Sequence, residues 1–401
     1  MQAGPIARLQ KRTYNTIMSR ASRAINIEDL RELAKKRLPR MVFDYIDGGA
    51  EDEITLRRSV DRYADYELQW NSLVDISKID ASTKVMGNPN PLPFFISPTA
   101  ASRLFHPKDG EFAVAGAAQK AGIAYSASTL ASQTLEDISK VAPDVPKFIQ
   151  IYVWKDRGVV KEFLDRAKAA GFTGCILTVD TAVAGYRERD PRNGFSVPPK
   201  INSKTATQAL ARPGYLWQIL SGPKIGPANF ARPGGGKGAG DVMGTINNLF
   251  DRTLTWKDAE WMANEWGGAF AVKGIATKEN DLRATEHGAT AVWLSNHGGR
   301  QIDTSVPVID LLPEVRDAVD SHIEVIADGG VRRGSHVLKL IARGATSVAI
   351  GRAYLYGLAA GGEAGVARSI QILKDDVERG LALLGVPKLA DLDDTLLRQR
   401  I

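Results

Sequence analysis

Short apolar runs alternate with helical stretches along most of the chain from residue 93 onward. The runs are rich in branched and aromatic residues and have few polar positions, which is typical of parallel strands that are buried on both faces. Eight runs occur: PFFIS (93–97), IAYSA (123–127), FIQIY (148–152), CILTVD (175–180), AFAVKG (269–274), AVWLSN (291–296), EVIADG (324–329) and TSVAIG (346–351). The pattern predicts the α/β class, as a closed (β/α)8 TIM barrel.

Three segments depart from this alternation. Residues 27–59 predict two helices that are broken around Gly48 and Gly49 and form a lid over one barrel end. Residues 361–384 predict a long closing helix. About 75 residues separate Asp190 from the fifth strand, too many for an ordinary loop, so we expect a long insertion after strand 4. The expected organisation is a basic arm over 1–26 and one domain over 27–401, with a basic insertion at about 191–250.

Composition narrows the class of protein. Hydrophobic residues make up 44% of the chain and charged residues 24%, as in ordinary globular proteins. The single cysteine, Cys175, lies in an apolar run and is expected to be a buried thiol. With no cysteine pair and five histidines, no metal site is expected, and a reducing, cytoplasmic compartment is favoured. No apolar stretch reaches about 18 residues, so no segment that spans a bilayer is expected.

The net charge of +6 is concentrated in two stretches without acidic residues, the first 27 residues and residues 191–240. Because the excess charge is confined to these stretches, no nucleic-acid partner is expected. The second stretch also holds an apolar cluster: Tyr215, Leu216, Trp217, Ile219 and Leu220. Basic and apolar side chains together suit an anionic membrane surface, whereas the alternative is a soluble flap. We therefore expect peripheral attachment to the inner face of the cytoplasmic membrane.

Chemically suggestive residues gather where the predicted strands end. They are Gln150, Tyr152, Thr178, Asp180, Lys273, Ser295, His297, Asp328, Gly351 and Arg352. TIM barrels place their active sites at the carboxyl ends of the strands, so these side chains are expected to meet at one barrel mouth.

A phosphate site is expected after strands seven and eight, in DGGVRRG (328–334) and IGR (350–352). The glycines permit close approach of the backbone, and the helix N-termini offer free N–H groups. Arg332 and Arg352 add charge-assisted hydrogen bonds.

A base and an anion clamp are expected in SNHGGRQID (295–303). His297 can accept a proton near neutral pH, and the forked guanidinium of Arg300 suits a carboxylate. Asp180 could orient the imidazole and stabilise its charged form. A lone histidine is more often structural, but a barrel mouth favours a catalytic role. The ammonium of Lys273, within an apolar run, indicates either a Schiff base or an anionic neighbour such as a reduced flavin.

These residues resemble the family of FMN-dependent α-hydroxy acid dehydrogenases and oxidases, which includes glycolate oxidase, flavin L-lactate dehydrogenase and mandelate dehydrogenase. The resemblance runs from about residue 27 to 395 and is carried in order by FDYIDGGAEDE, SPTA, QIYVWKDR, LTVD, GYRERD, VKG, SNHGGRQID, DGGVRRG and IGRAYLYGLAAGGEAGV. It implies bound FMN across the barrel mouth and, as in the family, a homotetramer.

The resemblance also implies roles for individual residues. Flavin-ring contacts would be Pro98, Thr99, Ala100, Ser128, Gln150, Thr178, Lys273 and Ser295. Ribityl and phosphate contacts would be Asp328, Gly330, Arg332, Gly351 and Arg352. Arg300 and Arg187 would hold the substrate carboxylate, with hydroxyl groups from Tyr45 and Tyr152. His297 would remove a proton with support from Asp180 and Tyr152, by hydride transfer, which we favour, or through a carbanion.

The substrate and the acceptor stay open at this stage. Positions expected to line the substrate pocket, Ala100, Leu130 and Ala184, are small and apolar, which suits L-lactate without excluding larger 2-hydroxy acids. We expect an L-lactate dehydrogenase that uses a quinone or a cytochrome. The alternatives are an oxygen-using oxidase and a mandelate-type dehydrogenase. Three alternatives are more remote: a phosphate-binding barrel isomerase, an IMP dehydrogenase and a non-catalytic barrel. An IMP dehydrogenase would need a cysteine after strand six.

Overall fold

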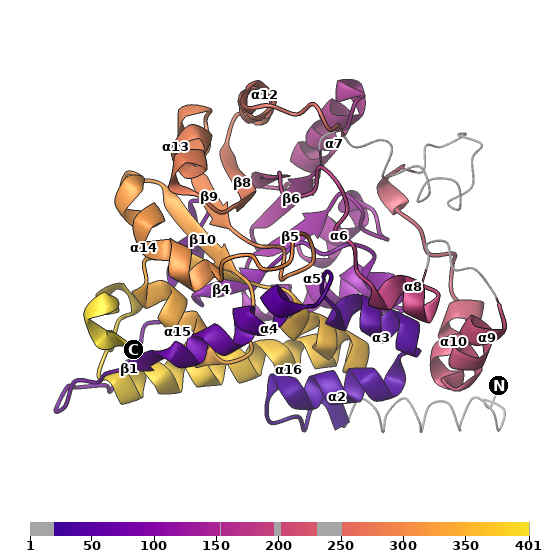
Figure 1. Cartoon of the computed structure of the whole chain (residues 1–401), viewed down its shortest axis with the longest axis horizontal. Helices are drawn as coiled ribbons and strands as arrows, with labels where there is room; N and C mark the ends of the chain where they lie inside the picture. The colour runs from indigo at the N-terminus through magenta and orange to yellow at the C-terminus, as the bar shows by residue number, and fades with distance from the viewer. Residues whose placement is uncertain (1–19, 153, 196–201, 231–250, 401) are drawn as a thin grey trace.

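The computed structural model describes residues 20–152, 154–195, 202–230 and 251–400 (Figure 1). Most of the predicted basic arm, residues 1–19, lies outside the described residues. Two pieces of the predicted basic insertion, residues 196–201 and 231–250, also lie outside them.

Eight parallel strands close into a barrel in the order β10-β11-β4-β5-β6-β7-β8-β9 (Figure 1). The strands are β4 (Phe94–Ile96), β5 (Tyr125–Ser128), β6 (Lys147–Ile151), β7 (Gly174–Thr178), β8 (Ala269–Ile275), β9 (Ala291–Leu294), β10 (Glu324–Asp328) and β11 (Ser347–Ile350). Each of the eight apolar runs overlaps one of them. The predicted TIM barrel is therefore confirmed.

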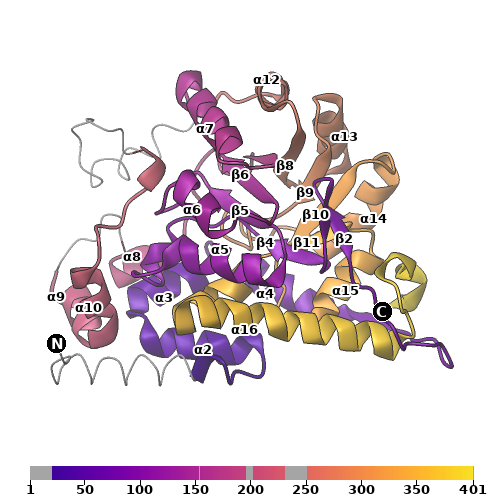
Figure 2. The same cartoon turned by 180° about the vertical axis from the view of Figure 1, so that it is seen from behind.

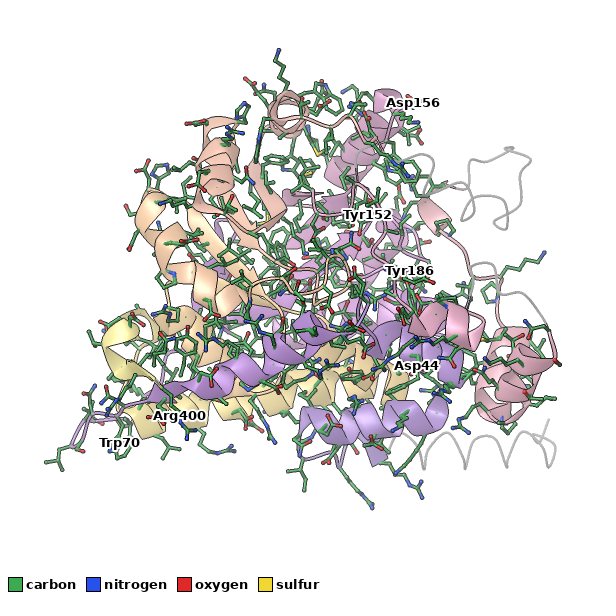
Figure 3. All side chains as sticks on the ribbon, in the orientation of Figure 1. Asp44, Trp70, Tyr152, Asp156, Tyr186 and Arg400 are labelled. Atoms are coloured by element: carbon green, nitrogen blue, oxygen red, sulfur yellow. The ribbon has the colours of Figure 1, made fainter. Side chains whose placement is uncertain are left out.

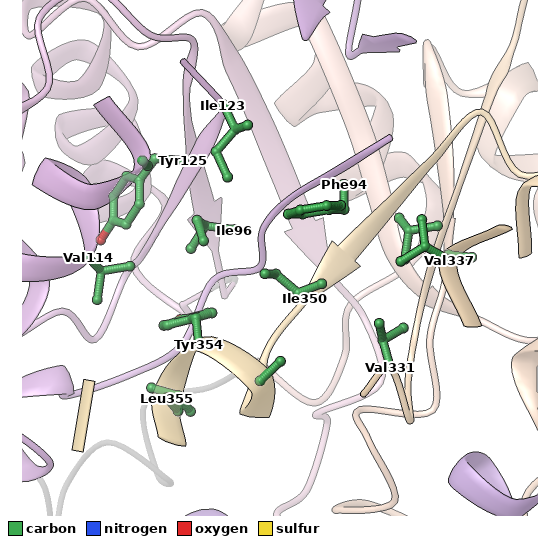
Figure 4. Close-up of a cluster of buried hydrophobic side chains, with 14 of the residues drawn as sticks. Phe94, Ile96, Val114, Ile123, Tyr125, Val331, Val337, Ile350, Tyr354 and Leu355 are labelled. Atoms are coloured by element: carbon green, nitrogen blue, oxygen red, sulfur yellow. The ribbon is translucent and has the colours of Figure 1, made fainter. Parts of the chain in front are cut away.

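The strands are apolar on both faces because each face packs against protein. Inside the barrel the rings of Phe95, Phe148 and Trp293 meet edge to face, with ring centroids 6.1 and 5.3 Å apart. On the outside, Phe94 and Ile96 of β4 lie in a second buried cluster between the strands and the surrounding helices (Figure 4). This two-sided burial explains why the runs show no alternation of polar and apolar residues.

A hairpin that the sequence pattern did not predict closes the amino end of the barrel. It pairs β2 (Thr83–Val85) with β3 (Asn88–Asn90). Met86 at its turn is buried in the inner cluster, and its backbone N–H donates to Glu324 at the start of β10. In the described part of the chain, this hairpin covers the amino end of the barrel, so the carboxyl end is the one left for ligands.

Helices surround the strands (Figure 2). They are α5 (Gly110–Ala121), α6 (Leu135–Val141), α7 (Arg157–Ala169), α12 (Trp256–Trp266), α13 (Lys278–Glu286), α14 (Val308–Ala318), α15 (Gly334–Ala342) and α16 (Arg352–Leu384). The predicted closing helix is the second part of α16, which bends where Gly361 and Gly362 leave the helical conformation. Strands β1 (Tyr66–Leu68) and β12 (Leu397–Gln399) pair and join the N-terminal region to the C-terminus.

Residues 27–61 form three helices, so the expectation of two in this segment was wrong. They are α2 (Ile27–Arg37), α3 (Arg40–Asp47) and α4 (Ile54–Asp61). The additional break lies at Leu38, which is extended with ψ of 148° because the proline that follows it disfavours the helical conformation. The predicted break at Gly48 and Gly49 is present. We call residues 40–61 the lid, because the backbone of this segment contacts residues at the barrel mouth.

The described part of the insertion folds into α8 (Arg189–Asn193), α9 (Ser203–Leu210), α10 (Pro213–Ser221) and the 3-10 turn η3 (Ala228–Phe230). Helices α9 and α10 are attached to the body of the protein. The buried hydroxyl of Tyr215 donates to the carbonyl of Leu104 at 2.8 Å, and the side chain of Gln208 accepts the backbone N–H of Met41 at 2.8 Å. Tyr215 therefore faces the protein, and Ile219 of the same apolar cluster also packs partly buried against the core, whereas Trp217 and Leu220 are exposed.

Candidate active site

A cavity of about 470 Å³ opens at the carboxyl ends of the strands. Fourteen of the nineteen predicted site residues line it: Tyr45, Pro98, Thr99, Ala100, Tyr152, Arg187, Lys273, His297, Arg300, Asp328, Gly330, Arg332, Gly351 and Arg352. The other five lie outside the lining and are Ser128, Gln150, Thr178, Asp180 and Ser295. Figure 3 labels Tyr152 among the side chains of this region. The fold thus gathers residues that are far apart in sequence at one mouth.

His297 and Asp180 form a hydrogen-bonded pair beside the cavity. The Nδ1 atom of His297 lies 3.0 Å from one carboxylate oxygen of Asp180 and 3.1 Å from the other. This contact leaves Nε2 for the cavity. Burial acts to raise the pKa of Asp180, but the charge and the hydrogen bond of His297, together with the charge of Lys273, outweigh burial and leave this pKa below its usual value. The carboxylate of Asp180 is therefore favoured in its ionised form beside the imidazole.

The backbone next to this pair adopts positive φ angles at two positions, His297 and Gly274. His297 adopts a left-handed conformation with φ of 54°, which is uncommon for a residue with a side chain. Its backbone N–H donates to Ser295 at 3.0 Å, which holds the turn. Gly274, with φ of 97°, passes Asp180 so closely that a Cβ there would lie 2.6 Å from the carboxylate carbon. Only glycine fits at that position, which explains the VKG sequence.

Two arginines and Tyr45 of the lid form a cationic corner of the cavity. The Arg300 guanidinium lies 4.9 Å from the centroid of the Tyr45 ring, and that of Arg187 lies 5.8 Å away. Arg300 also donates to the backbone carbonyls of Tyr45 and Gly48 at 2.6 and 3.2 Å. Burial and the neighbouring charge of Arg187 lower the pKa of Arg300. A carboxylate between the two guanidinium groups would relieve this repulsion.

A polar network forms the floor beneath the cavity. The buried ammonium of Lys273 donates to Ser295 at 2.9 Å and lies 3.4 Å from Asp328. Ser295 in turn donates to Asp328 at 2.6 Å, and the indole of Trp293 donates to the same carboxylate at 3.1 Å. The positive charge of Lys273 is thus held in place at the ends of β8, β9 and β10.

Two buried polar groups of the floor lack a partner among the described residues. They are the amide nitrogen of Gln150, at the end of β6, and the hydroxyl of Thr178, at the end of β7. Buried polar groups in folded proteins are almost always hydrogen-bonded. These two atoms therefore indicate a ligand with acceptor or donor atoms above the floor.

The predicted phosphate end of the cavity differs in one respect from the expectation. All three guanidinium nitrogens of Arg352 donate to backbone carbonyls, those of Ile46, Gly48 and Gly298, each at 2.8 Å. Arg352 therefore fastens the lid to the barrel. Burial lowers the pKa of this guanidinium to about 10. Gly330 packs so tightly on the lid that a Cβ there would lie 1.8 Å from the carbonyl oxygen of Ser59.

The cavity also has aromatic walls that sequence reasoning missed. Phe105 and Phe195 line it, and both rings stack on Tyr45, with centroids 6.2 and 4.3 Å away. Phe195 belongs to the insertion and Tyr45 to the lid. Isolated phenylalanines in loops carry no sequence signal for a site, so only the folded chain identifies them.

Comparison with known proteins identifies the family. The sequence profile described as FMN-dependent dehydrogenase matches residues 34–399. The chain belongs to the FMN-dependent dehydrogenase family. It is an oxidoreductase, and FMN is its cofactor. Within the family, a putative L-lactate dehydrogenase of Mycobacterium tuberculosis is 40% identical over 388 residues, which are 97% of this chain and 92% of that protein.

Other relatives in this FMN-dependent family include a protein named an oxidase and a dehydrogenase with a different substrate in its name. An L-lactate oxidase of Nostoc sp. is 38% identical over 384 residues, 95% of this chain and all of that protein. The crystal structure of the monotopic membrane protein (S)-mandelate dehydrogenase superposes with a TM-score of 0.90 at 34% identity, over 94% of this chain and 100% of that chain. The names share the oxidation of a 2-hydroxy acid.

The residues of the mouth fit FMN. A flavin ring carries carbonyl and nitrogen atoms that can satisfy the amide of Gln150 and the hydroxyl of Thr178. The buried charge of Lys273 suits the extra negative charge of a reduced ring. Gly351 precedes α16, whose first backbone N–H groups have no partner within the helix and suit a phosphate.

Proposed function

We propose that this enzyme oxidises an L-2-hydroxy acid to the 2-oxo acid, with L-lactate as the substrate and a quinone or a cytochrome as the acceptor. The observation that carries the proposal is the pairing of His297 with Asp180 in the cavity that also holds Arg300 and Arg187. A base beside an anion clamp matches a substrate with a hydroxyl group next to a carboxylate. The names of the relatives support the same chemistry.

The substrate is oriented by this chain's own side chains. Arg300 and Arg187 bind the carboxylate through forked hydrogen bonds. The hydroxyl groups of Tyr45 and Tyr152 lie on the same cavity and contribute further hydrogen bonds. Binding of the carboxylate fixes the position of C2 and its hydroxyl group relative to His297, which is the main source of stereochemical preference.

Proton transfer is assigned to His297. Its Nε2 atom takes the proton of the C2 hydroxyl group, and Asp180 stabilises the resulting imidazolium through Nδ1. Bound FMN supplies a ring that accepts the two electrons of the reaction. We favour loss of the C2 hydrogen as hydride over its removal as a proton.

We propose that the cofactor is held by the residues that the family resemblance indicates. The ring would contact Pro98, Thr99, Ala100, Ser128, Gln150, Thr178, Lys273 and Ser295, the ribityl chain would contact Asp328, and the phosphate would contact Gly330, Arg332, Gly351 and Arg352. Because Arg352 already binds three lid carbonyls, Arg332 and the start of α16 carry more of the phosphate binding.

The apolar side chains on the cavity wall suit the short apolar side chain of lactate. Ala100, Leu130 and Ala184 line it together with the rings of Phe105 and Phe195. A mandelate-type dehydrogenase is the second candidate, favoured by the similarity to the (S)-mandelate dehydrogenase structure. An oxygen-using oxidase is the third, favoured by the relative named L-lactate oxidase.

The experiment that tests the function is anaerobic. The holoenzyme is mixed with L- and D-lactate, glycolate, and L- and D-mandelate, and the loss of flavin absorbance is followed. We expect rapid bleaching with L-lactate, slower bleaching with L-mandelate and none with the D-acids. Oxygen, ubiquinone-1 or cytochrome c is then admitted, and the acceptor that restores the colour fastest is the physiological class. Bleaching by none of the acids would refute the proposal.

We further propose that the enzyme is cytoplasmic and tetrameric and attaches to the inner face of the membrane through α10. No helix in the described ranges is long and apolar enough to cross a bilayer. Trp217 and Leu220 of α10 are 51% and 75% exposed, and Leu210 of α9 is 68% exposed. These apolar side chains belong to the acid-free basic segment, which supports contact with anionic lipid.

Replacing Trp217 and Leu220 with serine is expected to abolish most co-flotation of the protein with anionic liposomes, because it removes the apolar side chains that enter the lipid. The measurement is flotation with phosphatidylglycerol vesicles at low salt. Leu383→Ser, which changes another exposed leucine on α16, is the matched control. Equal flotation of the double variant and the control would refute attachment through α10.

A further inference from the structure

A second cavity of about 400 Å³ lies beside the first, between the carboxyl end of β7 and the start of α12. Tyr152 and Thr181 line both cavities, so the two spaces share a wall. The remaining lining residues are Leu177, Thr178, Val179, Ala182, Asp251, Arg252, Leu254, Thr255, Trp256 and Ala259. The proposed binding of the substrate does not use this second cavity.

The lining of the second cavity suits an uncharged, aromatic ligand. Leu177, Val179 and Leu254 supply apolar walls, and the indole of Trp256 offers a flat surface for stacking. The one carboxylate, that of Asp251, is paired with Arg157 at 2.7 Å. Arg252 also lines this cavity, but it is exposed to solvent. A hydroxy acid anion would therefore find weaker compensation here than between the two guanidinium groups of Arg300 and Arg187.

The second cavity also reaches the cofactor floor. Thr178, whose buried hydroxyl has no partner in the described part of the chain, lines the second cavity and not the first. The same residue is among the proposed contacts of the flavin ring. An occupant of the second cavity would thus lie one side chain away from the ring. The outer rim of the second cavity carries the exposed residues Ala182, Arg252 and Thr255, so the cavity can be reached from solvent.

We propose that the second cavity binds the ring of a quinone, which is the electron acceptor of the enzyme. This inference rests on the proposed function. Of the three acceptor classes, oxygen needs no built site and a cytochrome needs an exposed protein surface, whereas a quinone needs an apolar slot with a few hydrogen-bonding groups. The hydroxyl group of Thr181 and the guanidinium of Arg252 are such groups for the quinone carbonyls.

The electron balance is that of a two-electron transfer. The quinone takes two electrons from the reduced cofactor and two protons from the cofactor and solvent, and becomes the hydroquinone. The cofactor returns to its oxidised form. Because the acceptor has its own cavity, the corner that binds the carboxylate does not have to admit an apolar ring.

The test fills the second cavity without touching the first. Ala182 is exposed and Leu254 half-buried, and both line only the second of these two cavities, so Ala182→Phe and Leu254→Trp are introduced separately. Val183→Phe is the matched control, because this neighbour is 59% exposed and lines neither cavity. Binding of ubiquinone-1 to the oxidised holoenzyme is measured by titration calorimetry, and flavin bleaching by L-lactate is measured without oxygen.

We expect the Kd of ubiquinone-1 to rise about tenfold or more in both filling variants, since the larger side chain takes up space that the quinone ring would occupy. The KM for ubiquinone-1 should rise in parallel, while the rate of flavin bleaching stays that of the wild type. The control should match the wild type in the Kd for ubiquinone-1, in the KM for ubiquinone-1 and in the rate of flavin bleaching. An unchanged Kd in both filling variants would overturn the inference.

The inference would also be overturned if the filling variants changed the KM for bulky 2-hydroxy acids while the quinone Kd stayed constant, because the cavity would then hold the substrate side chain. Failure of the proposed function has a different signature. In that case no 2-hydroxy acid bleaches the flavin, although calorimetry still reports whether the quinone binds.

Discussion

His297→Asn is expected to slow anaerobic flavin reduction by L-lactate about 10³-fold, which is within the range for loss of a general base. Asparagine preserves hydrogen bonding near Asp180 but cannot accept a proton from the substrate. In the wild type, Nδ1 of His297 is held 3.0 Å from Asp180, so Nε2 is the atom presented to the cavity. Stopped-flow absorbance of the flavin gives the rate directly.

The control for this variant is His322→Asn, which alters an exposed histidine away from the cavity. The control is expected to reduce at the wild-type rate. The flavin spectrum and the ratio of FMN to protein should be unchanged in both variants, which separates loss of chemistry from loss of cofactor. A rate for His297→Asn within about tenfold of the wild type would rule out His297 as the base.

Arg300→Met is expected to lower kcat/KM for L-lactate by about 10²- to 10³-fold, since removal of one partner from a buried charge pair costs a few kcal/mol. The methionine leaves the substrate carboxylate with Arg187 alone. Arg300 also holds the lid through the carbonyls of Tyr45 and Gly48, so part of any loss could come from the lid. A comparison of substrates separates the two causes.

The methyl ester of L-lactate lacks the carboxylate charge but keeps the reacting C2 hydroxyl group. The wild type is expected to prefer the acid over the ester strongly, and Arg300→Met should lose most of this preference. Arg343→Met, which removes an arginine that pairs with Asp394 outside the cavity, is the control and should keep it. If Arg300→Met discriminated between acid and ester as the wild type does, Arg300 would not bind the carboxylate.

The eight strands and their order were predictable from sequence because burial on both faces leaves uninterrupted apolar runs, and glycine marks where the following helices end. The position of the active site followed from the same pattern, since polar residues come directly after those runs and parallel strands in a barrel all end at one mouth. These are local features of the chain. The sequence therefore determined the barrel, its open end and the residues that gather there.

The partnerships inside the site were decided only by the tertiary structure. Asp180 and His297 are 117 residues apart, and no local pattern states that their side chains lie in hydrogen-bond contact. Similarly, the ring of Phe195 reaches Tyr45 only because the insertion packs on the lid. Arg352 was expected at a phosphate, whereas its nitrogens bind lid carbonyls, a geometry that depends on where the backbone of residues 46–48 passes.

The number of helices in the lid region was predicted wrongly because two local sequence signals, glycine and proline, act close together there. The glycines at 48 and 49 were recognised as a break, but the stronger constraint that Pro39 places on Leu38 adds another, and three helices result. The β2–β3 hairpin is too short and too polar to be seen as a pair of strands, and it is fixed by the fit of Met86 into the barrel. Sequence sets which residues can be buried or can react, whereas contacts between distant segments decide which of them touch.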